Sequence, residues 1–265
     1  MPAVPTPLPQ PAETPAWQRF AAVAPDAAGR PRIAIVIDDL GPDRARTARA
    51  IALVPQVTLS FMPYASDVRA EAEAARRAGH ELLAHVPMEP LEGAAAMGPH
   101  GLTVKAVPAE TMAELRWDLE RFDAYVGVNN HMGSRFTADE NAMAPVLEEL
   151  KARGLMFLDS RTTGATVAAL LAQRLGMKFA ERDVFLDDEV NASAIAARLA
   201  ETEARARRGG TAVAIGHPHD ATLAALALWI ETLPRKGLAL VPLTDVVAAR
   251  AGALTHPQPP RAAAR

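Results

Sequence analysis

Short, nearly continuous apolar runs, each followed by a helix-like segment, recur through most of this chain and limit the folds open to it. The runs are rich in Ile, Val and Leu, which is typical of parallel strands covered on both faces. Seven or eight such βα units within one domain favour an α/β barrel over an open doubly wound sheet. The expected strands lie at residues 33–38, 57–62, 80–85, 127–131, 155–159, 184–187, 211–216 and 237–243.

The two ends of the chain lack this alternation. Residues 1–31 begin with a Pro- and Ala-rich stretch that cannot build a core, so they are predicted to form a disordered linker. One barrel domain is predicted over residues 32–250, and residues 251–265 are predicted to be a disordered tail. Because such a linker often joins a domain to something upstream, we expect the chain to be the soluble portion of a longer, anchored protein. No stretch approaches the roughly 20 consecutive apolar residues of a membrane helix, so no transmembrane segment is predicted.

Composition and missing motifs exclude several functional classes. The sequence has no cysteine, so disulfides, thiolate metal ligands and cysteine nucleophiles are excluded. The formal net charge is -3 and the Lys and Arg residues are scattered, which argues against nucleic acid as a partner. No glycine-rich nucleotide-binding loop follows the first expected strand, and no nucleophile-elbow serine is present. Any metal must therefore be bound by His, Asp, Glu or Asn.

Ionisable and metal-ligating residues follow five of the expected strands, at or just after the point where each strand ends. In parallel α/β folds the carboxyl ends of the strands meet at one rim, where reactive groups gather. Three of the seven histidines occupy matching positions, so we expect a shared site at this rim. The polar residues at these strand ends are Asp38, Asp39, His85, Glu89, Asn129, Asn130, His131, Arg135, Asp159, Ser160, Arg161 and His217.

Single residues of this set also have purely structural interpretations. Asp39 could cap the helix expected to start near Pro42, and a lone histidine such as His85 is more often a hydrogen-bonded core residue than a ligand. Two adjacent acids on an apolar strand cost desolvation unless a cation offsets their charge, so Asp38 and Asp39 together favour a metal site. The acidic turn at residues 187–189 is interpreted as solvated. The histidines interpreted as surface residues are His80, His100, His219 and His256.

The chemistry of these side chains suits a mononuclear hydrolytic centre. A divalent ion such as Zn2+ takes imidazole nitrogen and carboxylate oxygen, and it acidifies a bound water toward neutral pH. A nearby carboxylate can then take the proton of that water, while a separate histidine protonates the leaving group. Asp38 would be the base, Asp39 a ligand and His217 the acid.

Five segments stand at these strand ends in order: IAIVIDDLG, GHELLAHVPMEP, GVNNHMGSRF, FLDSRT and AIGHPH. Together they resemble the divergent polysaccharide deacetylases, a branch of the carbohydrate esterase superfamily that includes the chitooligosaccharide deacetylases. The resemblance spans residues 32–248 and implies a distorted (β/α)7 barrel of the NodB-like type. It also implies metal-dependent removal of N- or O-acetyl groups from sugar polymers. The first family motif, an Asp-Asp pair, is matched by Asp38 as base and Asp39 as ligand, and the last motif by His217.

One departure from the family pattern affects the expected ligands. The second motif of the superfamily is a His-x-x-x-His pair, and here His85 is followed four residues on by Glu89. Either Glu89 is a ligand, or the third ligand comes from elsewhere, for which His131 is the natural substitute. We expect Asp39, His85 and His131 to bind the metal. Glu89 is expected to contact these ligands without binding the metal itself.

A second departure concerns the third motif. Its arginine has no clear match in this sequence, although Arg135 and Arg161 could each orient Asp38. Asn130 and Asp159 complete the residues expected next to the ligands or the substrate.

These inferences predict a metal-dependent hydrolase, a carbohydrate deacetylase acting on an envelope polysaccharide or glycan. The altered second motif leaves one alternative open, a barrel that keeps the metal and binds a glycan or an envelope protein without turnover. A third alternative is a metal-free scaffold in which the acids and histidines satisfy one another. Acetylated sugar polymers lie outside the cytoplasm, so the protein is expected in the periplasm or at the cell surface of a bacterium.

Overall fold

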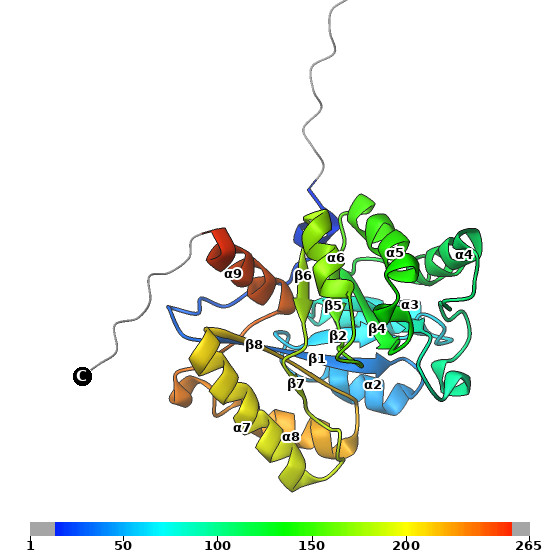
Figure 1. Cartoon of the computed structure of the whole chain (residues 1–265). Helices are drawn as coiled ribbons and strands as arrows, with labels where there is room; N and C mark the ends of the chain where they lie inside the picture. Colours follow the sequence, from blue (N-terminus) through cyan, green and yellow to red (C-terminus); the bar gives the residue numbers. More distant parts are fainter. Residues whose placement is uncertain (1–13, 256–265) are drawn as a thin grey trace, which may run out of the picture.

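The computed structural model describes residues 14–255, and a curled parallel sheet lies at its centre (Figure 1). Along the sheet the strand order is β6-β5-β4-β3-β2-β1-β8-β7, and β9 pairs with β1 beside this path. All these pairings are parallel, as the continuous apolar runs predicted. The strands are β1 (Arg32–Leu40), β2 (Thr58–Phe61), β3 (Leu82–Met88), β4 (Gly127–Met132), β5 (Met156–Asp159), β6 (Phe179–Glu181), β7 (Val184–Phe185), β8 (Thr211–Gly216) and β9 (Ala239–Leu240).

Helices connect most of the strands and cover the sheet from outside. Short 3-10 turns occur at residues 94–97, 136–138 and 234–236. The α-helices are α1 (Ala16–Arg19), α2 (Arg44–Ile51), α3 (Val68–Arg77), α4 (Pro108–Leu119), α5 (Glu140–Ala152), α6 (Ala168–Leu175), α7 (Ala192–Gly209), α8 (Asp220–Ile230) and α9 (Leu243–Thr255).

Strand β1 shows how the sheet is buried on both faces. Ile33, Ile35 and Ile37 belong to the larger apolar cluster, to which helices α2 to α8 all contribute. Ala34 and Val36, which alternate with them, belong to a second cluster that includes residues of α9. Because consecutive side chains of a strand point to opposite faces, burial of both faces produces the unbroken apolar run seen in the sequence.

Helix α9 closes the end of the barrel where the strands begin. The N–H of Leu243 donates to the hydroxyl of Thr58 at 3.1 Å, and the N–H of Thr244 donates to Oε1 of Glu81 at 3.0 Å. The Thr244 hydroxyl also donates to Oε2 of the fully buried Glu81. Thr58 opens β2 and Glu81 precedes β3, so α9 lies opposite the rim where the strands end.

The two edge strands of the sheet do not pair with each other. β6 and β7 stand at opposite ends of the strand order, although only Arg182 and Asp183 separate them in the chain. We call this opening between β6 and β7 the seam. The fold is therefore a curled half-barrel, consistent with the distorted (β/α)7 barrel predicted from the sequence.

Part of the predicted linker is folded against the barrel. α1 lies within residues 14–31, and the N–H of Trp17 donates to the carbonyl of Gly154 at 3.0 Å. Trp17 and Phe20 pack against the second apolar cluster. These two aromatic side chains provide apolar surface to bury, which explains why a Pro- and Ala-rich segment contacts the domain here.

Helix α9 overlaps the tail predicted from the sequence. α9 continues to Thr255, so the start of the predicted tail at residue 251 is helical. The rest of the predicted linker and tail, residues 1–13 and 256–265, lies outside the described residues. None of the helices within residues 14–255 combines the length and apolar character needed to cross a bilayer.

Candidate metal centre and its cleft

The end of β1 places two carboxylates on the same rim. In a regular strand, consecutive side chains point to opposite faces. Between Ile37 and Leu40, however, β1 advances by three residues while β2 advances by two, so β1 holds one extra residue here. Asp39 has a left-handed backbone with a φ of 58°, which short polar residues tolerate better than most. This bulge allows Asp38 and Asp39 to face one site.

The helix cap that could have explained Asp39 is supplied by another residue. Asp43 caps α2, and its carboxylate accepts from the N–H of Arg46 at 3.0 Å. Between Asp39 and Asp43 the chain turns at Gly41, which has a φ of 109°. The backbone N–H of Gly41 donates to the hydroxyl of Thr47 at 2.9 Å. A Cβ at Gly41 would come within 2.5 Å of a side chain after β2. Asp39 is therefore not needed as a cap.

Asp39, His85 and His131 form a compact group that we call the ligand triad. Oδ1 of Asp39 lies 3.2 Å from Nε2 of His85 and 2.9 Å from Nδ1 of His131. One potential ligand atom from each residue lies within 4.8 Å of the others. The two histidines come from neighbouring strands, since His85 pairs with Asn129 on β4 and His131 lies two residues further along β4. The structure thus brings together the three ligands expected from the sequence.

Asn129, which the sequence placed at a strand end without a role, connects this triad to Asp38. Its Nδ2 donates to both carboxylate oxygens of Asp38, at 2.9 and 3.0 Å, and its Oδ1 accepts from the hydroxyl of Ser60 at 2.6 Å. Nδ1 of His85 lies 2.9 Å from the same Oδ1, so this nitrogen carries a proton. Nε2 of His85 is then directed at Asp39, as in histidines whose other nitrogen is fixed by a hydrogen bond for metal binding.

The donor atoms of the ligand triad fit a small divalent ion. Oδ1 of Asp39 is buried and has no hydrogen-bond partner among the described residues. A lone pair on Nε2 of His85 that faces this oxygen at 3.2 Å is unfavourable unless a metal ion or a proton lies between them. In a tetrahedral zinc site the ligand atoms are roughly 3.3 Å apart, because each lies roughly 2.0–2.1 Å from the ion. The separations of 3.2 and 2.9 Å in the triad are close to this value.

The triad also controls the protonation of its own carboxylate. Burial alone would raise the pKa of Asp39, but the neighbouring His131 and His85 outweigh burial and hold the pKa far below its usual range. Asp39 is therefore ionised at every physiological pH. An ionised carboxylate is the form that binds a cation.

Asp38 is buried beside the triad, 3.6 Å from Nε2 of His85. Burial raises the pKa of the Asp38 carboxyl, against the opposing effects of His85, His217 and the Asn129 amide. A carboxylate with a raised pKa accepts a proton more readily than an exposed one, which suits a general base.

Neither of the arginines predicted to orient Asp38 reaches it. Arg135 pairs with Glu89 at 3.3 Å, and Arg161 pairs with Glu181 at 2.6 Å. The prediction that one of these arginines orients Asp38 is therefore wrong, because each has an acidic partner closer at hand. The orienting contact comes instead from the β4 amide described above.

Glu89 lies away from the ligand triad. Its Oε2 accepts from the N–H of Val104 at 2.8 Å, while Oε1 contacts Arg135. Its backbone carbonyl accepts from the N–H groups of Arg135 and Phe136, both at 3.0 Å. Glu89 therefore fastens the connection between β3 and α4, and the structure does not place it among the ligands.

Asn130 and Asp159 hold two unusual turns at the rim. Nδ2 of Asn130 donates to the carbonyl of Met132 at 2.7 Å, and the buried Asp159 accepts from the N–H of Arg161 at 2.8 Å. Met132 and Arg161 both have left-handed backbones, with φ of 53° and 49°, as Asp39 does. Strained conformations of this kind often gather at functional sites. Asn130 and Asp159 thus stabilise the rim, and among the described residues neither side chain forms a hydrogen bond with a side chain of the triad.

His217 follows β8, and its Nε2 lies 3.9 Å from Oδ2 of Asp39. Its ring Nδ1 lies 3.0 Å from Oδ1 of Asp187, and its backbone N–H donates to Oδ2 of Asp187 at 2.7 Å. Burial would lower the pKa of His217, but Asp187, Asp39 and Asp38 outweigh burial and raise the pKa to about 9. His217 therefore carries a proton at neutral pH and can donate it from Nε2.

The solvated interpretation of the acidic turn is wrong for Asp187. This carboxylate is buried and also accepts from the hydroxyl of Thr222 at 2.7 Å, whereas Asp188 and Glu189 are exposed as expected. Asp187 is close enough to His217 and His219 to form a second group of metal-ligating type. Three donors already occupy its oxygens, so Asp187 acts as the orienting partner of His217.

Two of the remaining histidines have defined contacts. His80 is fully buried, and its ring nitrogens lie 2.8 Å and 3.0 Å from the carbonyls of Val57 and Ile51, so its surface interpretation is wrong. His100 is half-buried, lies 2.8 Å from Glu114 and stacks on a tryptophan ring. His256 lies outside the described residues.

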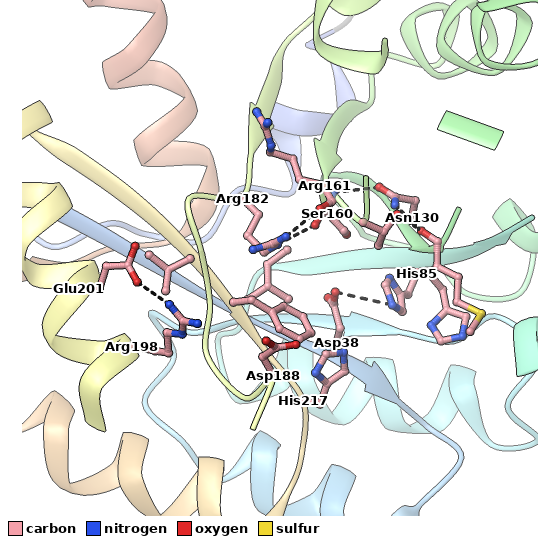
Figure 2. A pocket seen from close by; sticks show the side chains of 16 residues that line it. Asp38, His85, Asn130, Ser160, Arg161, Arg182, Asp188, Arg198, Glu201 and His217 are labelled. Carbon is pink, nitrogen blue, oxygen red and sulfur yellow. Dashed lines mark hydrogen bonds and ion pairs between the residues drawn. The ribbon is translucent and has the colours of Figure 1, made fainter. Parts of the chain in front are cut away.

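A cavity of about 560 Å³ opens over the site (Figure 2). Asp38, His85 and His217 line one part of it, and Arg198 and Glu201 of α7 line the opposite part (Figure 2). A second hollow of about 280 Å³ shares the α7 residues and continues along that helix. The site therefore lies in a cleft made of two hollows that adjoin at Arg198 and Glu201.

Sequence comparisons associate this chain with one family. The model of that family, described as divergent polysaccharide deacetylase, matches residues 35–247. The uncharacterized protein YibQ of Escherichia coli (strain K12) is 36% identical over 203 residues, which cover 77% of this chain. This chain spans 63% of the length of YibQ.

Two solved structures show the same fold. The uncharacterized protein ATU2773 from Agrobacterium tumefaciens C58 matches with a TM-score of 0.85 and 29% identity, over 88% of this chain and 95% of that one. The peptidoglycan deacetylase PdaC from Bacillus subtilis matches with a TM-score of 0.50 and 15% identity, over 85% of this chain and 95% of that one. At this low identity, the second likeness concerns the fold alone.

Proposed function

This chain belongs to the divergent polysaccharide deacetylase family, and we propose that it is a metal-dependent hydrolase that removes acetyl groups from a polysaccharide or another glycan. The observation that carries the proposal is the convergence of the ligand triad, with Asp38 and His217 beside it. Two imidazole nitrogens and one carboxylate form a ligand set of the hydrolytic zinc type. We therefore propose Zn2+ as the metal.

Asp38 and His217 divide the proton transfers of this reaction between them. A divalent ion held by Asp39, His85 and His131 would polarise the acetyl carbonyl and make a water molecule more acidic. Asp38, fixed through both oxygens by Asn129, takes a proton from the water that attacks the carbonyl carbon.

The same reaction ends with proton donation to the sugar. The bond between the acetyl carbon and the sugar nitrogen or oxygen breaks, and His217 gives its proton to that atom. Acetate and a free amine or hydroxyl are the products. Asp187 keeps the His217 ring aimed and stabilises its protonated form, as carboxylate partners of catalytic histidines do.

We also propose an envelope glycan as the substrate and the periplasm or cell surface of a bacterium as the location. Acetylated sugar polymers occur outside the cytoplasm, and a cleft made of two adjoining hollows offers room for more than one sugar unit. The similar proteins named above come from bacteria.

The decisive experiment compares three Asp-to-Asn variants of one short segment. Zinc-loaded wild-type protein should contain about one metal ion per chain and release acetate from an acetylated sugar oligomer. Asp38→Asn should keep the metal and lose turnover, because it removes the base, whereas Asp39→Asn should lose the metal. Asp43→Asn is the matched control, since Asn caps a helix as well as Asp does, and it should behave as wild type.

Each result bears on a separate part of the proposal. Full turnover in Asp38→Asn would rule out the proposed base. Metal content without turnover on a broad panel of acetylated sugars, together with measurable glycan affinity, would replace the hydrolase by a glycan-binding role. If wild-type protein binds no metal after incubation with zinc, the proposed metal centre is wrong.

A further inference from the structure

Arg182 lies in the seam and lines the cleft together with Asp38 (Figure 2). Its Nε donates to the carbonyl of Ser160 at 2.7 Å, and its Nη2 donates to the carbonyl of Arg161 at 2.8 Å. The ring of Phe185 lies 5.0 Å from its guanidinium carbon. These contacts from the segment after β5 and from β7 fix the guanidinium in one place before any ligand arrives.

Arg182 is the arginine of this cleft that has no acidic partner in the described part of the chain. Arg161 pairs with Glu181 at 2.6 Å, and Arg198 pairs with Glu201 at 3.0 Å. Arg182 contacts two carbonyl oxygens and an aromatic ring, and no carboxylate lies within ion-pair distance of it. Its positive charge is therefore held by no ion pair at the wall of the cleft, and Asp159, Asp38 and Asp188 attract it only from beyond ion-pair distance.

The surroundings of Arg182 make a charge without an ion-pair partner costly. The side chain is half-buried, and burial lowers the pKa of its guanidinium. The nearby acid Asp159 is occupied by the N–H of Arg161 and the hydroxyl of Thr166, and Asp188 is exposed to water. A guanidinium has five N–H donors, of which Arg182 uses two on the protein.

A fixed, partly desolvated guanidinium with free donors is a receptor for planar or tetrahedral anions. Carboxylates and phosphates accept two parallel N–H bonds from such a group, and these bonds are stronger than neutral ones. We propose that the cleft selects a glycan with an anionic group, a carboxylate or a phosphate, on the acetylated sugar or its neighbour, and that Arg182 binds this group. The inference rests on the proposed function, because it names the substrate class of the same cleft.

The test measures binding with zinc-loaded Asp38→Asn protein, so that no ligand is consumed. Three probes are compared by calorimetry: a neutral β-1,4-linked tetramer of N-acetylglucosamine, the same tetramer oxidised to carboxylates at C6, and the same tetramer phosphorylated at C6. We expect at least one charged tetramer to bind roughly 10- to 100-fold more tightly than the neutral one, and the difference to shrink as salt is added. The preferred charged probe shows whether the site favours a carboxylate or a phosphate.

Substitution of Arg182 then assigns this preference to one residue. Arg182→Gln should bind all three tetramers alike, while Arg182→Lys, which keeps the charge without the planar fork, should retain part of the preference. Arg174→Gln is the control, because Arg174 is an exposed residue of α6 paired with Glu140, and it should keep the full preference. Thermal melting checks that each variant is folded.

The outcomes separate this inference from the proposed function. Charged tetramers that bind no better than the neutral one, or a full preference in folded Arg182→Gln, would overturn the inference. If Arg182→Gln does not fold, Arg182→Lys takes its place, and a full preference in folded Arg182→Lys would overturn the inference. Failure of the proposed function would appear differently, as zinc-loaded wild type that hydrolyses none of the three tetramers.

Discussion

The side-chain amide of Asn129 has an acceptor oxygen and a donor nitrogen with different roles, and two substitutions can separate these roles. Its Oδ1 accepts from Nδ1 of His85, and its Nδ2 donates to both oxygens of Asp38. Asn129→Asp keeps an acceptor for His85 but replaces the donor with a second carboxylate. Asn129→Leu removes both groups at similar volume. The first variant should therefore bind metal without turnover, and the second should lose both properties.

The size of the effect follows from the distance between the groups. Two negative charges 2.9 Å apart repel by roughly 6 kcal/mol at an effective dielectric constant of about 20, which corresponds to about four pKa units. Asp38 and the new carboxylate would consequently share a proton at neutral pH, and Asp38 could not act as a base. Loss of general-base catalysis lowers kcat by roughly 10²- to 10⁴-fold.

Zinc affinity and acetate release measure the two roles of the Asn129 amide separately. Competition with a chelator should show zinc affinity within a few-fold of wild type for Asn129→Asp and a loss of roughly 10- to 100-fold for Asn129→Leu. Acetate release should fall in both variants, and melting temperatures confirm that both are folded. The reasoning is refuted if Asn129→Asp keeps wild-type turnover at pH 7, or if it loses zinc as completely as Asn129→Leu does.

Two further predictions concern buried acids. Asp187→Asn should lower kcat roughly 10- to 100-fold at pH 7 with KM and zinc content unchanged, because His217 loses its orienting partner; steady-state kinetics check this, and unchanged kcat would contradict it. Burial raises the pKa of Asp118 to about 8, so the folded chain keeps a proton that the unfolded chain releases near pH 4, and stability falls as pH rises between these values. Urea unfolding at pH 5 and pH 7 should show wild type losing up to about 2.7 kcal/mol more than Asp118→Asn, and equal losses would contradict the prediction.

The architecture could be predicted because β1, β3, β4, β5 and β8 each carry a local signal. A parallel strand buried on both faces is apolar throughout, so the run at residues 33–38 is visible without knowledge of the fold. The convergence of Asp39, His85 and His131 was also predictable, because strand ends of one parallel sheet meet at one rim. β6 escaped detection because it has only three residues, and one of them is Glu181.

The partners of the site residues could not be predicted in the same way. The residue that orients Asp38 depends on side-chain directions around the whole rim. In the structure this residue is Asn129, 91 residues away in the chain, and not an arginine. Asp187 looked solvated because two further acids follow it, yet the strand before it turns its carboxylate inward to His217. Such choices depend on long-range contacts, which local periodicity does not contain.

The left-handed backbone of Asp39 restricts which side chains can replace it. Glu could also coordinate an ion, but its longer side chain adopts this conformation at a higher energetic cost. Asn adopts it as readily as Asp and lacks only the negative charge. A single-nucleotide change from an Asp codon to an Asn codon would therefore disarm the centre while leaving the barrel intact, so in this scaffold the capacity for catalysis can be lost independently of the ability to fold.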